Sequence, residues 1–329
     1  MKEAIVTAAE SHELELVLDS VVGETADVLV LELRRPDAGA LPAWAPGAHI
    51  DLVLPSGKIR QYSLCGDVAD ASRYRVAVLR EAAGRGGSEE IHAVAKAGLT
   101  IRTRGPRNHF VLVEAPRYLF VAGGIGITPM LPMIHQAESA GRPWRLVYGG
   151  RSRGSMGFVA EIAKRSGGTV TLLPQDEMGL PDLDALLAQV EPDAAIYGCG
   201  PAGMLKALKE AAAQHGRASA LHIESFSAPD DVAPPAGGAG DTAFEVELRK
   251  SGVTLHVPAA RSLGDVLQEA GIDVPFSCQE GYCGTCETRV LEGVPDHRDT
   301  ILNEEEKAAG NLMMVCCGRS RTPRLVLEL

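Results

Sequence analysis

Along the first third of the chain, apolar and polar residues alternate with a period of two, which is typical of β-strands with one buried face. Six such segments, each bounded by Gly, Pro or Asp, occupy residues 14–21, 26–35, 49–55, 58–64, 74–81 and 99–105. Short strands at this spacing favour a closed antiparallel barrel. We therefore expect an all-β domain over residues 1–113.

The pattern changes after residue 113. Continuous apolar runs such as 118–124 and 194–200 alternate with stretches of helical period, including 155–167 and 201–216. Alternating strands and helices predict a parallel sheet covered by helices on both faces, with its ligand at the carboxyl ends of the strands. This α/β domain is expected over residues 114–228.

A stretch rich in Pro, Gly, Ala and acidic residues follows at 229–241, and its composition predicts a flexible tether. From Phe244 to residue 272 the pattern indicates a hairpin and a helix, and a cysteine-rich loop comes next. A third, smaller domain is therefore expected over residues 242–329. A length of 329 residues suits such a multidomain chain.

The cysteines near the end of the chain carry the strongest chemical signal. Cys278, Cys283 and Cys286 follow the spacing C-x4-C-x2-C, and Cys316 lies beyond a gap of 29 residues. This is the spacing of plant-type [2Fe–2S] clusters. A zinc site would more naturally show two C-x2-C pairs, and an odd count of seven cysteines without an export signal disfavours a disulfide framework. Cys317 is an alternative to Cys316, which we favour for its spacing.

Charge and hydropathy restrict the partners. The formal net charge is −11, and no run approaches the length of a membrane-spanning apolar segment. This balance argues against nucleic acid and against an anionic membrane surface. We expect a cytoplasmic protein and a monomer.

Two stretches of the barrel interrupt the plain strand pattern. Arg60-Gln61-Tyr62-Ser63 presents a cation, an aromatic ring and a hydroxyl in succession, and the glycine-rich segment 84–88 opens a short helix with Ser88 near its N-cap. Free N–H groups at a helix start attract anions, and the fork of Arg60 suits phosphate. A glycine-rich hairpin alone is more often only a turn. Together the two stretches describe a pocket with a phosphate end and a flat-ring end.

In the second domain, the segment GGIGITP ends the first expected strand. Gly124 and Gly126 would let the backbone approach a pyrophosphate, Thr128 could cap the next helix, and Pro129 fits its first turn. The segment departs from the dinucleotide fingerprint, because Pro129 stands where a third glycine is expected. The general fingerprint therefore does not establish a dinucleotide site.

No acidic residue closes the second expected strand of this domain, where Arg151-Ser152-Arg153 stands instead. An acidic residue would bind a ribose 2′-hydroxyl, whereas arginines can accept a 2′-phosphate. The choice between NADH and NADPH stays open on these residues.

The motifs together resemble known families. The first domain is similar to the flavin-binding barrel of the ferredoxin–NADP reductase superfamily through RQYSL, GRGGS and GPRNHF, and the second to its nicotinamide-nucleotide domain through GGIGITPM and YGCGPAGM. The third resembles the β-grasp of plant-type ferredoxins. In this order, and with the segment 286–316, the chain resembles the phthalate dioxygenase reductase and vanillate demethylase reductase family.

The resemblance implies specific site residues. The implied flavin site consists of Arg60, Gln61, Tyr62, Ser63, Val78, Leu79, Gly87 and Ser88. The implied nicotinamide site consists of Gly124, Thr128, Pro129, Arg151, Ser152, Cys199, Gly200, Pro201, Met204 and Phe226. Ser63, Thr128 and Cys199 are the implied catalytic residues, which position the reacting rings. Without the resemblance, Cys199 would be a small buried strand residue and Phe226 an ordinary core phenylalanine.

The resemblance also implies a function. Electrons would pass from NADH, with NADPH possible, through FMN and a [2Fe–2S] cluster held by Cys278, Cys283, Cys286 and Cys316. Their acceptor would be a Rieske-type non-haem iron oxygenase that forms a transient complex with the chain. A cytochrome P450 as the partner, or direct reduction of small acceptors without a partner, remain the alternatives.

Overall fold

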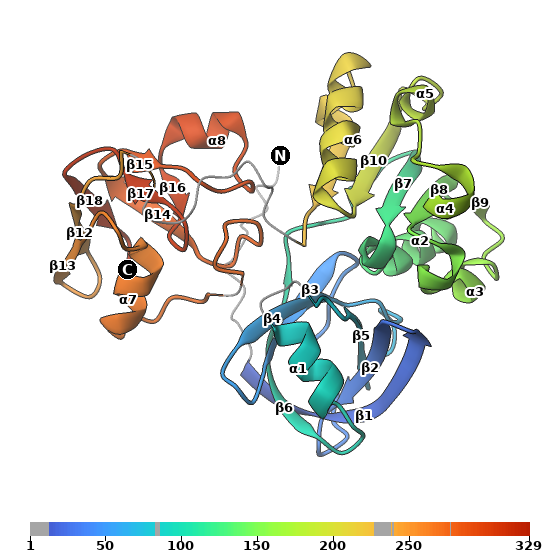
Figure 1. The fold of residues 1–329 in the computed structure, drawn as a ribbon, viewed down its shortest axis with the longest axis horizontal. Coiled ribbons are helices and arrows are strands. Elements are labelled where there is room, and N and C mark those ends of the chain that lie inside the picture. The colour runs from blue at the N-terminus through green and yellow to red at the C-terminus, as the bar shows by residue number, and fades with distance from the viewer. Residues whose placement is uncertain (1–12, 83–85, 227–237, 239, 277) are drawn as a thin grey trace. The chain divides into compact units, whose positions relative to one another are not determined.

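The computed structural model describes residues 13–82, 86–226, 238, 240–276 and 278–329. The chain divides into two compact units, Met1–Glu224 and Ser225–Leu329, which we call the first and second unit (Figure 1). No helix in the described ranges is long and apolar enough to cross a membrane.

The first unit begins with the expected antiparallel barrel, and all six predicted strands are present. They are β1 (Glu13–Thr25), β2 (Val28–Arg34), β3 (Ala48–Val53), β4 (Ile59–Ser63), β5 (Tyr74–Leu79) and β6 (Thr100–Asn108). They pair in the order β4-β3-β6-β1-β2-β5 around a core that includes Leu16, Leu33, Ile50 and Leu52. Between β4 and β5, the described residues form one bridge, Leu64 to Val76, so the barrel closes along a thin seam.

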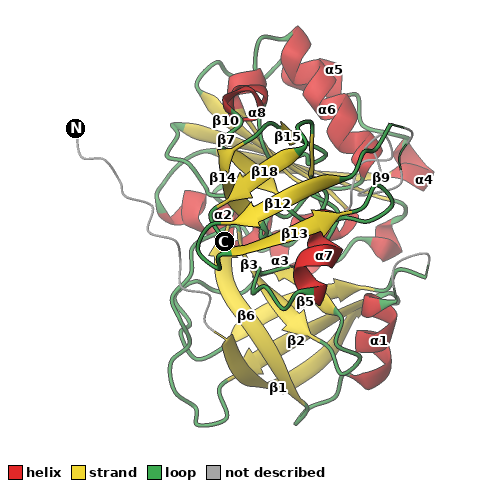
Figure 2. Cartoon of the chain, turned by 90° about the vertical axis from the view of Figure 1, so that its left-hand side faces the viewer, coloured by secondary structure: helices red, strands yellow, loops and turns green. Residues whose placement is uncertain are grey.

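A short helix, α1 (Gly87–Val94), accompanies the barrel strands (Figure 2). Its N-cap is Gly86 in the left-handed conformation, and no side chain caps the helix. The hydroxyl of Ser88 instead accepts a hydrogen bond from the Glu81 N–H at 3.1 Å. The expectation that Ser88 lies near the N-cap is correct in position, but its hydroxyl has another partner.

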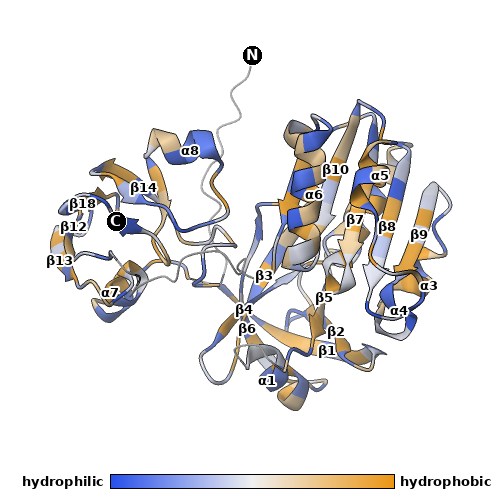
Figure 3. Cartoon of the chain, turned by 45° about the horizontal axis from the view of Figure 1, so that its top comes forward, coloured by the Kyte–Doolittle hydropathy of each residue, from blue (hydrophilic) through white to orange (hydrophobic). Residues whose placement is uncertain are grey.

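The second part of the first unit is a parallel sheet of five strands with helices between them. The strands are β7 (Arg117–Gly123), β8 (Trp144–Gly150), β9 (Gly168–Pro174), β10 (Ala194–Cys199) and β11 (Leu221–Glu224). The intervening helices are η1 (Gly124–Ile127), α2 (Met130–Ser139), η2 (Arg153–Ser155), α3 (Val159–Ile162), α4 (Gln175–Met178), α5 (Leu183–Leu187), α6 (Ala202–Gln214) and η3 (Ala218–Ala220). The hydrophilic and hydrophobic bands of α6 (Figure 3) match its packing of Leu205 and Leu208 against the sheet.

The helix expected over 155–167 is much shorter than predicted, because α3 has only four residues. Phe158 precedes it with φ of 64°, a left-handed conformation that a helix cannot continue through. The Phe158 N–H donates to the Glu24 carboxylate of β1 at 2.6 Å. A contact with the barrel therefore determines where this helix begins.

The barrel and the parallel sheet share one hydrophobic core. It joins Val28, Val30 and Ala77 of the barrel to Phe120 and Tyr148 of the sheet. The first two expected domains are thus packed together within the first unit.

The second unit is a mixed sheet with one helix on it, as the β-grasp resemblance implies. Its strands are β12 (Phe244–Leu248), β13 (Val253–Val257), β14 (Glu287–Glu292), β16 (Leu312–Met314) and β18 (Arg324–Leu327), in the order β13-β12-β18-β14-β16. A separate pair consists of β15 (Pro295–Asp296) and β17 (Arg319–Ser320). Helix α7 (Leu263–Glu269) lies beside β13 (Figure 2) and buries Leu263 and Leu267, and α8 (Glu304–Ala309) precedes β16.

Candidate functional site

The topology of the parallel sheet defines where a ligand binds. The strand order is β11-β10-β7-β8-β9, so the chain continues to β8 on one side of β7 and later places β10 on its other side; the strand order reverses between β7 and β10. In open α/β sheets, ligands bind at such a switch point, beyond the carboxyl ends of the strands. The segments that follow β7 and β10 are the two motifs GGIGITP and CGP.

These two turns contact each other through their main chains. A Cβ on Gly126 would lie 2.5 Å from the carbonyl carbon of Cys199 and 2.8 Å from the nitrogen of Gly200. Only glycine permits this approach. Gly126 is therefore needed for packing between the turns, and its approach to a pyrophosphate stays a prediction. Gly124, with φ of 54° and no atom near its missing Cβ, keeps an open side.

Thr128 does not cap the following helix, which corrects the expectation from sequence. Its hydroxyl donates to the Ile125 carbonyl at 2.9 Å, and the N-cap of α2 is Pro129. The reason is that the chain passes through a 3₁₀ turn before the helix, and Thr128 is the C-cap of that turn. Its side chain is buried beside the switch point.

A partly buried acid, Glu224, joins the two halves of the first unit and was missed by sequence reasoning. It ends β11 and is the register partner of Cys199 on β10, and the Ser63 hydroxyl of the barrel donates to its carboxylate at 3.5 Å. Burial raises the pKa of Glu224 to about 8, and burial also raises the pKa of the Cys199 thiol. At neutral pH both groups are uncharged, so the place where Ser63 and Cys199 come together carries no negative charge.

At the implied phosphate end of the barrel, Arg60 lies against the start of α1. The Arg60 side chain packs directly on Gly87, because a Cβ there would lie 2.6 Å from Arg60 Cγ. The side-chain nitrogen of Gln61 is buried and has no hydrogen-bond partner among the described residues. The orphaned donor of Gln61 fits a polar ligand, and Arg60, whose side chain leaves the other face of β4, suits phosphate. Gly84 and Arg85 of the expected turn lie outside the described residues.

Three other residues of the implied flavin site differ in how far they are buried. Tyr62 lies partly buried against the barrel core, and burial raises the pKa of its hydroxyl above the usual range. Val78 is fully buried near the end of β5, whereas Leu79 is partly exposed.

The end of β8 carries the arginine pair predicted to face the nucleotide. Arg151 and Arg153 are exposed, and Ser152 begins η2 with a capping box that includes Ser155. Arg153 lies 3.5 Å from the Glu177 carboxylate, and the described residues show no ion pair to Arg151. A cation therefore stands where the nucleotide fingerprint would have an acid.

Phe226 is not a core residue. It is 37% exposed, which excludes the plain alternative of an ordinary buried phenylalanine. Phe226 belongs to the second unit, and its role toward the nucleotide remains a prediction.

The cysteine loop brings the four predicted thiols together in the second unit. Cys278, Cys283, Cys286 and Cys316 are all buried. Hydrogen bonding with Cys278 lowers the pKa of Cys283, and hydrogen bonding with Cys278 and then Cys286 lowers that of Cys316. The thiols thus lie within hydrogen-bonding reach of each other.

Cys316 is better placed than its neighbour Cys317. Hydrogen bonding with Cys316 is the first cause of the raised pKa of the Cys317 thiol, whose sulfur lies 3.8 Å from the Met314 carbonyl and against Gly281; none of the three loop cysteines is among the causes of that shift. In the described ranges, no group of three or more His, Cys, Asp or Glu side chains could hold a single metal ion. A [2Fe–2S] cluster needs a different set of ligands, namely four thiolates shared between two irons. The four buried cysteines fit this set.

Comparisons with known proteins agree with this reading. The family of the 2Fe-2S iron–sulfur cluster binding domain matches residues 246–321. The chain is 44% identical to phenoxybenzoate dioxygenase subunit beta of Ectopseudomonas oleovorans, over 98% of this chain and 99% of the relative. It is 38% identical to vanillate O-demethylase oxidoreductase of a Pseudomonas strain, over 96% and 100%, and 35% identical to phthalate dioxygenase reductase of Burkholderia cepacia, over 98% and 99%.

Several solved structures are similar over nearly the whole chain. One is an intact type IV self-sufficient cytochrome P450 monooxygenase, with a TM-score of 0.86 and 42% identity, over 96% of this chain and 41% of that longer one. Another is phthalate dioxygenase reductase, described as a modular structure for electron transfer from pyridine nucleotides to [2Fe-2S], with a TM-score of 0.69 and 34% identity, over 96% and 98%.

A barrel fused to a nicotinamide-type sheet and followed by a ferredoxin unit defines an NAD(P)H-dependent iron–sulfur flavoprotein oxidoreductase. More narrowly, the chain belongs to the family of phthalate dioxygenase reductase and vanillate O-demethylase oxidoreductase.

Proposed function

We propose that this chain is the reductase component of an oxygenase system, and that it passes electrons from NADH through FMN and a [2Fe–2S] cluster to a Rieske-type oxygenase. The observation that carries the proposal is the meeting of Ser63, Glu224 and Cys199 at the switch point of a unit that shares one core with the barrel. A nicotinamide held at the switch point would there face a ring held by the barrel.

The residues of the first unit bind and orient rather than exchange protons. Arg60 would hold the flavin phosphate, Ser63 would offer a hydroxyl to the ring, and Thr128 and Cys199 would shape the nicotinamide pocket. Because Glu224 and Cys199 are neutral at pH 7, they leave the region free of charges that would disfavour hydride movement. FMN, when bound, supplies the conversion of a two-electron donor to one-electron steps.

In the second unit, Cys278, Cys283, Cys286 and Cys316 would hold the cluster, which accepts one electron at a time. Cys278 and Cys316 come from the two ends of this set, and hydrogen bonding between them lowers the pKa of Cys316, so the loop and the distant cysteine would share one cluster. The expected domain boundaries, the cytoplasmic setting and the monomeric state belong to the same proposal.

A direct test begins with the purified chain. We expect a yellow-brown protein that releases FMN on denaturation and contains about two irons per chain. It should reduce ferricyanide rapidly with NADH, but oxidise an organic substrate only when an oxygenase is added. A colourless protein with one zinc would reject the cluster, and release of FAD would reject FMN.

A haem monooxygenase is the second candidate partner. Its support is the self-sufficient P450 chain, of which a module similar to this protein forms part. Mixing the reduced chain with a purified P450 and with a purified Rieske oxygenase separates the two candidates, since only the true partner should be reduced at a rate that saturates with its concentration. Steady NADH oxidation by a small acceptor alone would favour a free-standing reductase.

A further inference from the structure

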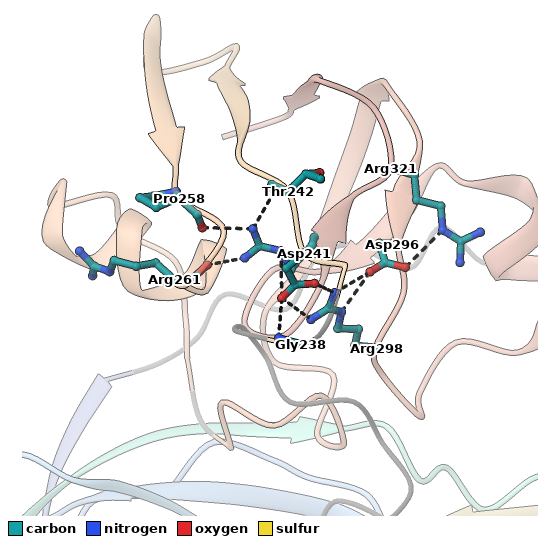
Figure 4. Close-up of polar contacts among 9 residues, drawn as sticks. Gly238, Asp241, Thr242, Pro258, Arg261, Asp296, Arg298 and Arg321 are labelled. Carbon is teal, nitrogen blue, oxygen red and sulfur yellow. Dashed lines mark hydrogen bonds and ion pairs between the residues drawn. The ribbon is translucent and has the colours of Figure 1, made fainter.

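Gly238, the first described residue after Phe226, is firmly held. The Gly238 N–H donates to the Asp241 carboxylate at 3.0 Å, and the Asp241 N–H donates back to the Gly238 carbonyl at 3.1 Å. The same carboxylate accepts two hydrogen bonds from the Arg298 guanidinium (Figure 4). Asp241 is the last residue of the stretch whose composition predicts a flexible tether, yet its side chain is only 6% exposed.

Two buried arginines make this site rigid. Arg319 is 2% exposed, donates to the carbonyls of Thr242, Pro258 and Arg261, and lies 3.7 Å from the Asp241 carboxylate. Arg298 also binds Asp296 at 3.0 Å, and Asp296 in turn accepts from Arg321 at 3.2 Å. The hydrogen bond with Arg298 holds the pKa of Asp241 below its ordinary value, so the carboxylate stays ionised at neutral pH.

The same network reaches the loop of the cluster cysteines. The Thr300 N–H donates to the Gly281 carbonyl at 3.0 Å, which fixes the segment after Arg298 against the loop between Cys278 and Cys283. On the other side, Arg319 lies three residues beyond Cys316, on the strand that pairs with the Asp296 strand. The point where the tether ends is therefore tied, through one carboxylate, to both segments that carry cluster ligands.

We propose that Asp241 is a positioning residue that anchors the end of the tether to the cluster-bearing segments, and thereby sets the rate at which electrons pass from flavin to cluster. The inference rests on the proposed function. Ion pairing between buried Asp241 and Arg298 is oriented by two parallel hydrogen bonds, so it specifies direction as well as attachment. Release of the anchor leaves the cluster itself in place, because none of its four proposed ligands contacts Asp241 through a hydrogen bond in the described residues.

The length of the tether gives the expected size of the change in the electron-transfer rate. The effective concentration of two linked sites falls roughly as the −3/2 power of tether length. Freeing the residues from Gly238 to Thr242 would lengthen the tether by about half, which dilutes the two sites about twofold. Loss of the fixed direction adds to this factor.

The test compares Asp241→Asn with Asp296→Asn in the full chain loaded with flavin and iron. Both variants remove a carboxylate that binds Arg298, but only Asp241 holds Gly238. In rapid mixing with NADH, we expect Asp241→Asn to slow the flavin-to-cluster phase at least about twofold, with the flavin reduction phase, the iron content and the paramagnetic resonance spectrum unchanged. Amide exchange in β12 should rise in this variant alone.

The proposal is overturned if the flavin-to-cluster rate is the same in Asp241→Asn and wild type. It is also overturned if Asp296→Asn lowers this rate as much as Asp241→Asn does. If Asp241→Asn loses iron, the test uses a second variant instead, in which six Gly and Ser residues are inserted before Gly238. The proposal predicts the same slow flavin-to-cluster phase in that variant. An unchanged rate in the lengthened chain overturns the proposal as well. A wild-type chain without any flavin-to-cluster phase rejects the proposed function instead.

Discussion

The barrel and the parallel sheet of the first unit are connected in one way, and the first and second units are connected in another. Barrel and parallel sheet share one core, and Arg75 of β5 bridges them with an ion pair to Glu161 at 2.8 Å and a cation–π contact over Phe158. The second unit has its own core, and a Pro- and Gly-rich stretch leads to it. Hydride transfer needs reacting atoms in near contact, whereas a single electron can cross a gap. Under the proposed function, the firm joint would serve the hydride step, and the stretch between the units would serve the electron step.

Replacing Cys283 by Ser should have the largest effect and should separate the two steps. The cluster loses one thiolate ligand, so reduction of an iron–sulfur or cytochrome acceptor should fall at least about a hundredfold, while NADH-dependent ferricyanide reduction stays near wild type. Steady-state assays with the two acceptors measure this. Cys317→Ser is the matched control and should leave both activities in place; equal loss of both activities in Cys283→Ser would contradict the separation.

Glu224→Gln should change how the free energy of unfolding depends on pH, and only for the first unit. Burial raises the pKa of Glu224 to about 8, so in wild type the free energy of unfolding declines as pH rises from its ordinary value near 4.5 towards 8, because only the unfolded chain is ionised there. The variant cannot ionise, and at pH 8 it should be more stable than wild type by up to a few kcal/mol, with no gain near pH 4.5.

Urea unfolding at several pH values, monitored on the first unit, checks this slope. Glu177→Gln, which changes an exposed carboxylate, is the control and should leave the slope as in wild type. A parallel pH dependence in Glu224→Gln and wild type would show that this carboxyl is not the source.

Arg151→Ala should alter nucleotide selection without touching the second unit. If the arginine at the end of β8 accepts a 2′-phosphate, kcat/KM for NADPH should fall about tenfold and that for NADH by less than twofold, since one hydrogen bond to a charged group is lost. Ferricyanide assays with both nucleotides give the ratio. Arg142→Ala, at the opposite end of the strand, should change neither value, and an equal loss with both nucleotides would remove Arg151 from selection.

Arg75→Met should weaken the firm joint by a smaller amount. The variant loses the pair with Glu161 and the contact with Phe158, and both side chains of the pair are partly exposed, so we expect about 1 kcal/mol of lost stability. Hydride transfer should slow several-fold in rapid mixing. Arg249→Met breaks a surface pair with Glu292 in the second unit and should leave hydride transfer unchanged; a similar fall there would mean that the joint plays no special role.

The parts of the molecule that depend on residues close together in sequence could be predicted from the sequence. Period-two alternation located all six barrel strands, and cysteine spacing located four buried thiols that lie close together. The start of α3 escaped prediction because Phe158 is held by Glu24, a residue far away in sequence. Glu224 escaped because an acid at a strand end ordinarily faces water, and its burial comes from Ser63 and Cys199 on other segments. Thr128 was misjudged because a 3₁₀ turn intervenes before α2.

The thin seam of the barrel has a consequence for assembly. In the described residues, β4 and β5 are linked by the single bridge of Leu64 and Val76, and β4 carries Arg60 to Ser63. A molecule bound along β4 would supply some of the cohesion that a full ladder supplies elsewhere, so the apoprotein should melt at a lower temperature and regain stability as ligand is titrated in. In the cell, the supply of this ligand would then decide how much of the newly made chain survives proteolysis.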